Sequence, residues 1–152
     1  MNTKENIFRS ARLKAAAYNE TLSSMDSAAP QLYMDRSHLQ RIETGGVTPD
    51  PGEVLIMADT YRTPRLLHRY CSEVCPVGRK IVDPVIKQDI DGVTVDALGS
   101  LMASEEIGRT LLQVSADHKI TPDENEKLTQ IIGKMRAIGN IAKQLELMMQ
   151  EV

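Results

Sequence analysis

Four side chains that can hydrogen-bond with DNA bases fall within six consecutive residues, 36–41. Arg36 and Arg41 can each bind O6 and N7 of guanine with two hydrogen bonds, and Gln40 can bind adenine in the same way. Ser37 can reach a base or a phosphate oxygen. A short polar helix that carries such side chains fits the major groove of duplex DNA. The segment is therefore the first candidate site, and its predicted partner is duplex DNA.

Groups near this segment could hold the phosphate backbone. His38 belongs to the segment itself, Ser24 stands at the start of the preceding predicted helix, and Gly45 and Gly46 follow the segment directly. Helix starts and glycine turns expose backbone N–H donors, which attract phosphate. We therefore expect Ser24, His38 and the amides around the two glycines to contact phosphates.

His68, Cys71 and Cys75 are spaced by three and four residues, which would place them along one helical face. Such a set could supply three ligands of a zinc ion. A fourth ligand has no obvious source, and the two-residue spacing common between zinc-binding cysteines is missing. Helical spacing also suits a disulfide poorly. We expect reduced cysteines that act as small apolar residues, with no bound metal.

Catalytic patterns are missing from the sequence. Residues 117–124 contain carboxylates but lack the glycine and the regular spacing of a calcium loop, so they are simply a turn and a helix cap. The chain has no glycine-rich phosphate loop, no metalloprotease histidine pair, and no nucleophile near a base at a known spacing. We expect a protein that is not an enzyme and that needs no cofactor.

The candidate site requires a helix over residues 36–43. Asp35 can serve as its N-cap, and the glycines at 45 and 46 can end it. Within the helix, Leu39 and Ile42 face inward and the other side chains point outward. The polar side chains thus occupy most of the helix surface.

Other helices are predicted around this one. Apolar spacing indicates a helix over residues 4–17, and Thr21 or Ser24 can cap a second helix that ends near residue 32. Pro30 should kink or shorten this second helix. Pro51 can begin a fourth helix that reaches residue 61, and a fifth spans about 64–74. Residues 75–80 read as a break, so we predict a five-helix domain over residues 1–80.

The rest of the chain, residues 81–152, is predicted to be a helical association domain. We expect helices over 83–98 and 97–116, and a capping box from Thr121 to Glu124 that starts the last helix. Apolar residues then recur at steps of three and four, which is a heptad seam. The seam must pack on a neighbouring helix or on a second copy of the chain. Its members are Leu128, Ile131, Met135, Ile138, Ala142, Leu145, Met149 and Val152, and Ile132, Ile141 and Met148 widen it.

Residues 27–32 and 35–45, followed by a proline-marked turn, resemble the Cro/repressor-type (Xre) helix-turn-helix family. The resemblance covers about residues 7–67. Ala28 and Ala29 match the small residues at which helix two packs on helix three in this family. Residues 42–45, with the sequence Ile-Glu-Thr-Gly, match its Ile-Glu-x-Gly exit, and the run from Glu53 matches its fourth helix.

This resemblance implies a repressor-like DNA-binding domain. It places Arg36, Ser37, Gln40 and Arg41 on the groove-facing side of the recognition helix. The implied function is that of a sequence-specific transcriptional regulator. The heptad seam of the last helix, which the resemblance does not cover, adds the hypothesis that two copies associate through this helix and bind an operator as a homodimer. A competing reading is a protein-interaction adaptor that kept the helix-turn-helix shape without reading DNA.

Charge is divided unevenly between the two halves. Residues 1–80 carry 11 Lys and Arg against 9 Asp and Glu, whereas residues 81–152 carry 7 against 12. Any DNA contact therefore belongs in the first half and must rest on a local cluster. No apolar run approaches the roughly 20 residues of a membrane span, and the charged N-terminal segment does not read as a secretory signal. We expect a cytoplasmic protein that does not enter a membrane.

Overall fold

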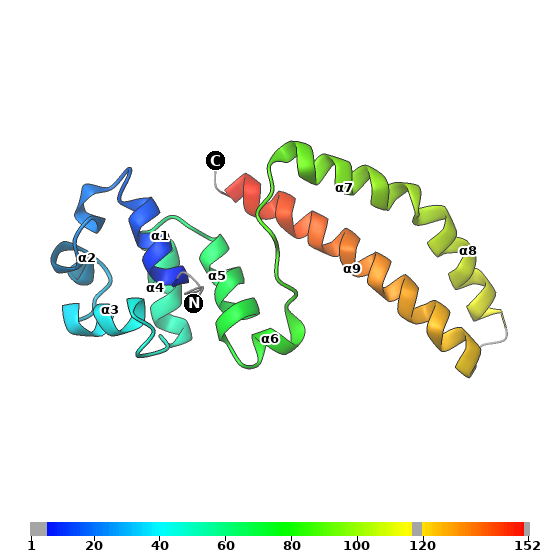
Figure 1. Cartoon of the computed structure of the whole chain (residues 1–152), viewed down its shortest axis with the longest axis horizontal. Coiled ribbons are helices and arrows are strands. Elements are labelled where there is room, and N and C mark those ends of the chain that lie inside the picture. The colour runs from blue at the N-terminus through cyan, green and yellow to red at the C-terminus, as the bar shows by residue number, and fades with distance from the viewer. Residues whose placement is uncertain (1–5, 117–119, 151–152) are drawn as a thin grey trace, which may run out of the picture. The chain divides into compact units, whose positions relative to one another are not determined.

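The computed structural model describes residues 6–116 and 120–150, and every regular element in these residues is a helix (Figure 1). The predicted all-α class is confirmed to this extent. The chain divides into two compact units, the first comprising the residues up to Pro84 together with Met149 and Gln150, and the second comprising Val85–Met148. The predicted boundary near residue 80 lies inside a short helix of the first unit.

Helix α1 (Ile7–Ala15) begins where the side chain of Asn6 accepts hydrogen bonds from the amides of Phe8 and Arg9. It is shorter at its C-terminus than the predicted 4–17, and residues 4 and 5 lie outside the described residues. Leu13 is apolar but lies on the outer side of the helix and is 48% exposed. Arg12 is buried in the core instead.

A 3-10 turn, η1 (Glu20–Leu22), precedes helix α2 (Met25–Gln31). Ser24 caps α2 as predicted, since its hydroxyl accepts the Ser27 amide at 3.2 Å. Helix α2 ends one residue after Pro30 and is only seven residues long, in keeping with the expected shortening. Proline has no amide hydrogen for the helical ladder, so it weakens the last turn.

Helix α3 (Arg36–Glu43) has the predicted bounds. Asp35 occupies the N-cap position, but its side chain makes no capping hydrogen bond. Leu39 and Ile42 are fully buried as predicted. Glu43 was expected to point outward and is buried, because it is the partner of Arg12.

Helix α4 (Pro51–Thr60) begins with a complete capping box. The Asp50 side chain accepts the Glu53 amide, and the Glu53 side chain accepts the Asp50 amide, each at 2.9 Å. Pro51 occupies the first helical turn, as expected. Leu55 is exposed although it was predicted as part of the apolar pattern of this helix.

Helices α2, α3 and α4 end in the same backbone motif. The first residue past each cap has a positive φ: Tyr33 at 54°, Gly45 at 80° and Arg62 at 49°. After each of them, the next amide donates back across the last turn, as Gly46 N does to Arg41 O at 2.8 Å. This is the Schellman motif, in which a left-handed residue closes the helix. The sequence indicated it only at Gly45, where glycine adopts this φ without strain.

The predicted helix over 64–74 is present as α5 (Arg65–Arg69), which continues into the π-helical turn η2 (Tyr70–Val74). The predicted break over 75–80 is partly wrong, because helix α6 (Gly78–Ile81) forms there. Gly78 makes this possible, since a Cβ at this position would overlap the carbonyl of Cys71. The close approach packs α6 onto the π turn.

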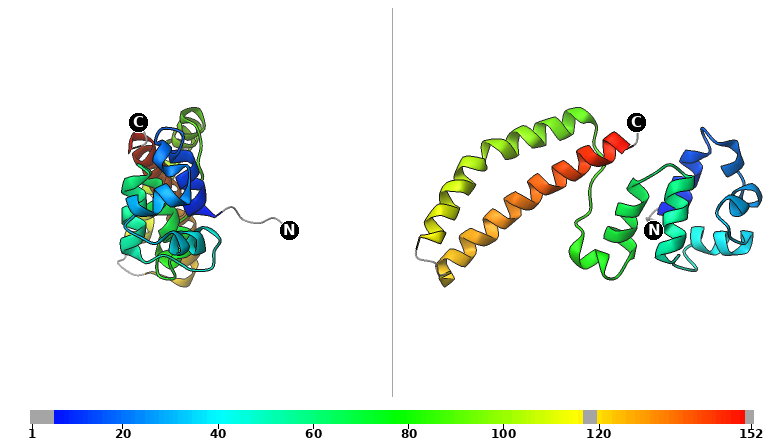
Figure 2. Two further views of the ribbon diagram at one scale, coloured as in Figure 1. Left: turned by 90° about the vertical axis from the view of Figure 1, so that its left-hand side faces the viewer. Right: turned by 180° about the vertical axis from the view of Figure 1, so that it is seen from behind.

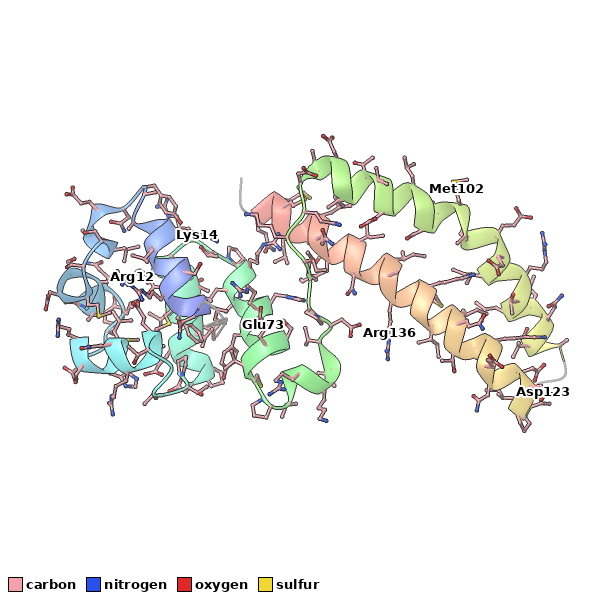
Figure 3. All side chains as sticks on the ribbon, viewed as in Figure 1. Arg12, Lys14, Glu73, Met102, Asp123 and Arg136 are labelled. Carbon is pink, nitrogen blue, oxygen red and sulfur yellow. The ribbon has the colours of Figure 1, made fainter. Side chains whose placement is uncertain are left out.

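One apolar core holds the first unit together. An ion pair is buried beside it: Arg12 Nε and Nη2 donate to the two carboxylate oxygens of Glu43 at 2.6 and 2.8 Å. Arg12 Nη1 also donates to the carbonyl oxygens of Leu22 and Ser23. Figure 3 labels Arg12 on α1. The arginine thus fixes α1, the turn before α2, and α3 in one arrangement. The core comprises Ile7, Phe8, Ala11, Ala15, Leu22, Ala28, Ala29, Leu32, Leu39, Ile42, Val54, Met57, Ala58, Tyr61, Leu66 and Tyr70.

The second unit is a helical hairpin (Figures 1 and 2). Helices α7 (Ile90–Met102) and α8 (Ser104–Ser115) form one arm and α9 (Pro122–Gln150) forms the other. The predicted helix start at residue 83 is wrong, because the chain is not helical until the Asp89 side chain caps α7 at Gly92 N. The predicted division near residue 97 is also wrong, since the helix break lies at Ala103. Helix α9 starts as predicted, and Glu124 accepts the Thr121 amide at 2.9 Å.

The predicted seam of α9 is only partly buried. Ile131 is buried and Leu128 and Ile138 are half-buried, but Met135 is 52% exposed and Leu145 is exposed. Further along, Gln144 and Leu147 are buried instead. The inward face shifts because the first half of α9 lies against α8 and the second half against α7, on the other side of the break at Ala103.

Candidate nucleic-acid interface

Helix α3 presents a polar surface over a buried apolar side. Arg36, Ser37, Gln40 and Arg41 are all exposed. They are held in place from below, because α1, α2 and α4 pack around the buried side of α3. The four side chains predicted to read bases therefore lie together on one exposed, rigidly supported helix.

Two of the cations on α3 already have polar neighbours. Arg36 Nε lies 2.8 Å from Asp26 Oδ1, in an ion pair exposed to solvent. Arg41 lies 3.4 Å from Nδ1 of His38. The exposed ion pair holds Arg36 only weakly, because solvent screens it. Arg36 can therefore exchange Asp26 for a base or a phosphate at small cost.

His38 occupies a different position from the one predicted. Its Nε2 lies 2.6 Å from Glu53 Oε1, and the ring is half-buried between α3 and α4. The other oxygen of Glu53 accepts the Asp50 amide. His38 thus ties α3 to the first turn of α4, and this bond competes with any role as a phosphate ligand.

The expected phosphate donors after α3 are already used. The Gly45 amide donates to Ile42 O at 3.1 Å and the Gly46 amide donates to Arg41 O at 2.8 Å. These bonds of the Schellman motif compete with phosphate for the two amides, so their contact with phosphate stays a prediction. Ser24 is exposed and its hydroxyl caps α2, so its contact with phosphate stays a prediction.

No protein-family model matches the chain. No curated protein and no solved structure matches it either. The function must therefore be argued from the geometry of α3 and its surroundings.

The spacing of His68, Cys71 and Cys75 could suit a zinc ion, although no bound metal is expected there. His68 lies in α5, Cys71 in η2, and Cys75 at the end of that turn. Among residues 6–116 and 120–150, no three His, Cys, Asp or Glu side chains are grouped to hold a metal ion. Residues 117–119 of the segment compared with a calcium loop lie outside the described residues. No helix in the described part of the chain is long and apolar enough to cross a membrane.

Sequence reasoning missed the side chains that hold α3 in place. Asp26 touches Arg36, Glu53 touches His38, and Arg12 binds Glu43 from within the core. The signal for Glu53 was available, since Asp50 and Glu53 have the spacing of a capping box. Nothing in the local sequence indicates the long-range pair of Arg12 and Glu43.

Proposed function

We propose that the protein is a sequence-specific DNA-binding regulator that reads the major groove with α3. The observation that carries the proposal is the single exposed surface formed by Arg36, Ser37, Gln40 and Arg41 on a helix whose other side is fully buried. Each of these side chains can bond to base edges or phosphates. The rigid mounting supports the proposal, because base readout requires side chains held in a fixed register.

The modest positive charge of the first half favours binding as a dimer. Two copies would present two α3 helices to successive major grooves, about 34 Å apart along the duplex. Linking two weak sites raises affinity without a strongly basic surface. The operator would then be an inverted repeat, and binding would weaken steeply with salt.

The test is selection of binding sites from a pool of random duplex DNA. We expect the wild-type protein to enrich an inverted repeat, and Arg36→Ala/Arg41→Ala to lose it at a cost of roughly 1 to 3 kcal/mol per arginine. Arg109→Ala/Arg136→Ala is the matched control, because it removes two exposed arginines from the second unit. Absence of enrichment at low salt would overturn the proposal.

A second candidate function is that of a protein-interaction adaptor without DNA readout. It is favoured by the second unit, where many large apolar side chains are exposed. Exposed apolar surface of this kind marks contact sites for other proteins. An adaptor would keep its partner after Arg36→Ala/Arg41→Ala, whereas the DNA reader would lose its operator.

A further inference from the structure

The two units differ in how well they bury their apolar side chains. Among the described residues up to Pro84, 16 apolar residues form the core of the first unit, and six large apolar side chains are exposed. In Val85–Met148 the proportion is reversed among the described residues. Five apolar residues are buried there, and twelve large ones are exposed. The hairpin therefore exposes far more apolar surface, relative to its core, than the first unit does.

One broad face of the hairpin is grooved, and its lining mixes polar side chains with apolar ones such as Val95, Ala137 and Ile141. Two grooves run between its arms, one between α7 and α9 and one between α8 and α9. Lys134 lines both grooves and binds Glu106 across them, with Nζ 2.6 Å from Oε2. We call this the groove face. Its other polar lining residues are Asp96, Ser100, Thr110, Gln113, Lys127, Gln130, Asn140 and Gln144.

The opposite face is apolar. Its residues stand two or five positions along the chain from the groove-lining residues Asp96, Glu106, Gln130, Ala137 and Asn140, which is 200° or 140° around an α-helix. The two arms of the hairpin run antiparallel. Residues that are rotated in the same direction about their helix axis, away from the line where the arms meet, therefore lie on the same side of the hairpin. We call this set the apolar face. It comprises Leu98, Leu101, Gly108 and Leu111 from α7 and α8, and Ile132, Met135, Gly139, Ala142 and Leu145 from α9.

Gly108 and Gly139 on the apolar face are open to the outside of the hairpin. A Cβ added to either would meet no atom within 4 Å, which is also true of Gly99 and Gly133 elsewhere in the hairpin. Glycine inside a helix is less favourable than alanine. Within the hairpin, neither position requires the small size or the backbone freedom of glycine. A second surface that packs closely on the apolar face would require the small size.

We propose that the apolar face binds the same face of a second copy, so that two hairpins form a four-helix bundle. The Glu106–Lys134 ion pair shows which residues of the two arms lie at the same level. Equal numbers of residues counted from this pair place Leu101 level with Gly139, Leu98 with Ala142, and Gly108 with Ile132. A twofold axis parallel to the helices stacks α7 and α8 on the partner's α9 at these levels. Every one of the three contacts then sets a large side chain against a small one.

The size of the apolar face is sufficient for a stable dimer. Helices α7 and α8 together span residues 90–115, which is about 39 Å at 1.5 Å per residue. Two helices side by side are about 20 Å wide. The face therefore offers roughly 800 Å² per copy, the amount buried per partner in a standard protein interface.

This proposal deepens the dimeric part of the proposed function, but its test needs no DNA. The mass in solution is measured by sedimentation equilibrium over a range of concentrations. We expect a species of about twice 16.9 kDa, and Gly139→Gln should weaken the dimer by at least about tenfold. Gly133→Gln is the matched control, because Gly133 is on the same helix, equally open, and outside the apolar face. A monomeric wild type, or equal effects of the two substitutions, would overturn the proposal.

A second pair of variants tests the same surface on the other arm. Leu101 lies on the apolar face, whereas its neighbour Met102 is 85% exposed and points away from α9 (Figure 3). Leu101→Gln should weaken the dimer and Met102→Gln should not. Circular dichroism of both variants confirms that the helices are intact. Dissociation by Met102→Gln alone would place the interface elsewhere.

Cross-linking tests which arms meet. In a Cys71→Ser/Cys75→Ser background, Leu101→Cys and Gly139→Cys proteins are prepared separately, then mixed and oxidised. We expect a disulfide-linked dimer in the mixture and little in either protein alone. Efficient self-linkage of Gly139→Cys would mean that α9 packs on α9, and would overturn the proposed stacking.

Discussion

Arg12 and Glu43, 31 residues apart in the chain, form a two-pronged ion pair in which both side chains are almost fully buried, at 4% and 1% exposure. The hydrogen bond with Glu43 raises the pKa of Arg12 above its ordinary value, which outweighs the opposing effect of burial. The guanidinium is therefore charged at every pH at which the protein is folded.

Removal of the acidic partner should be costly. Glu43→Gln would leave a buried arginine without its counter-charge, and we expect the free energy of unfolding to fall by about 3 to 5 kcal/mol. Urea unfolding followed by circular dichroism measures it, with the exposed Glu20→Gln as control. The double variant Arg12→Met/Glu43→Leu should recover much of the loss, since apolar side chains of similar size can replace a buried pair. A loss below about 1 kcal/mol in the single variant would contradict this view.

Tyr33 carries backbone strain in the turn between α2 and α3. Its φ is 54° and its side chain is 88% exposed, so the ring contributes little packing in return. A left-handed conformation costs an L-residue roughly 1 to 2 kcal/mol, and glycine avoids it at an entropic cost of roughly 0.5 to 1 kcal/mol. Tyr33→Gly should therefore stabilise the protein by about 0.5 to 1 kcal/mol in urea unfolding. Tyr33→Ala controls for loss of the ring and should be close to neutral.

A matching loss of stability is expected when the glycine at the end of α3 is replaced. Gly45 has the same backbone role with φ of 80°, so Gly45→Ala should destabilise the protein by about 1 kcal/mol. Tyr33→Gly and Gly45→Ala should change the free energy of unfolding in opposite directions. If both raised it or both lowered it, backbone strain at these turns would not explain the changes.

Asp26 is expected to restrain DNA binding. Its carboxylate holds Arg36 and would face the phosphates of a duplex bound to α3. Asp26→Asn should raise affinity by roughly two- to fivefold, the value of an exposed ion pair of about 0.4 to 1 kcal/mol. Asp59→Asn makes the same change of charge on an exposed site in α4 and should have a smaller effect. Fluorescence anisotropy with the selected operator measures both. Weaker binding by Asp26→Asn would instead show that Asp26 orients Arg36 for readout.

The Glu106–Lys134 bond gives the hairpin a dependence on pH. The hydrogen bond from Lys134 holds the pKa of Glu106 below its ordinary 4.5. A lowered pKa stabilises the folded state above pH 4.5, and this contribution is lost as the pH falls through the folded pKa. In Lys134→Met the pKa of Glu106 should return towards 4.5 in an NMR titration. Arg136→Met, which changes a cation on the same helix outside this bond, should leave it lowered.

The sequence predicted the elements whose signals are local. Helix α3 was bounded correctly because Asp35 precedes it, Gly45 follows it, and Leu39 and Ile42 mark its inner side. The start of α4 was equally clear from Pro51. Caps and prolines act within a few residues, so a single sequence reveals them.

Features decided by tertiary packing could not be predicted in this way. Glu43 looked like one more polar residue of α3, and only the fold brings Arg12 to it. The break at Ala103 has no glycine or proline signal, and it alone redirects the inward face of α9. The expected seam followed a straight heptad from Leu128 to Val152, and Val152 lies outside the described residues. A straight heptad ignores that α9 packs on two helices in turn.

Glu53 divides its carboxylate between two tasks: one oxygen begins α4 and the other holds His38 on α3. A genetic screen for variants in which α3 no longer binds its partner would therefore recover substitutions of Glu53. The residue belongs to the next helix, and its negative charge would repel DNA. On the sequence, such substitutions would suggest a second binding site. The hydrogen bond between Glu53 and His38 explains them instead as a loss of the contact that holds α3 in place.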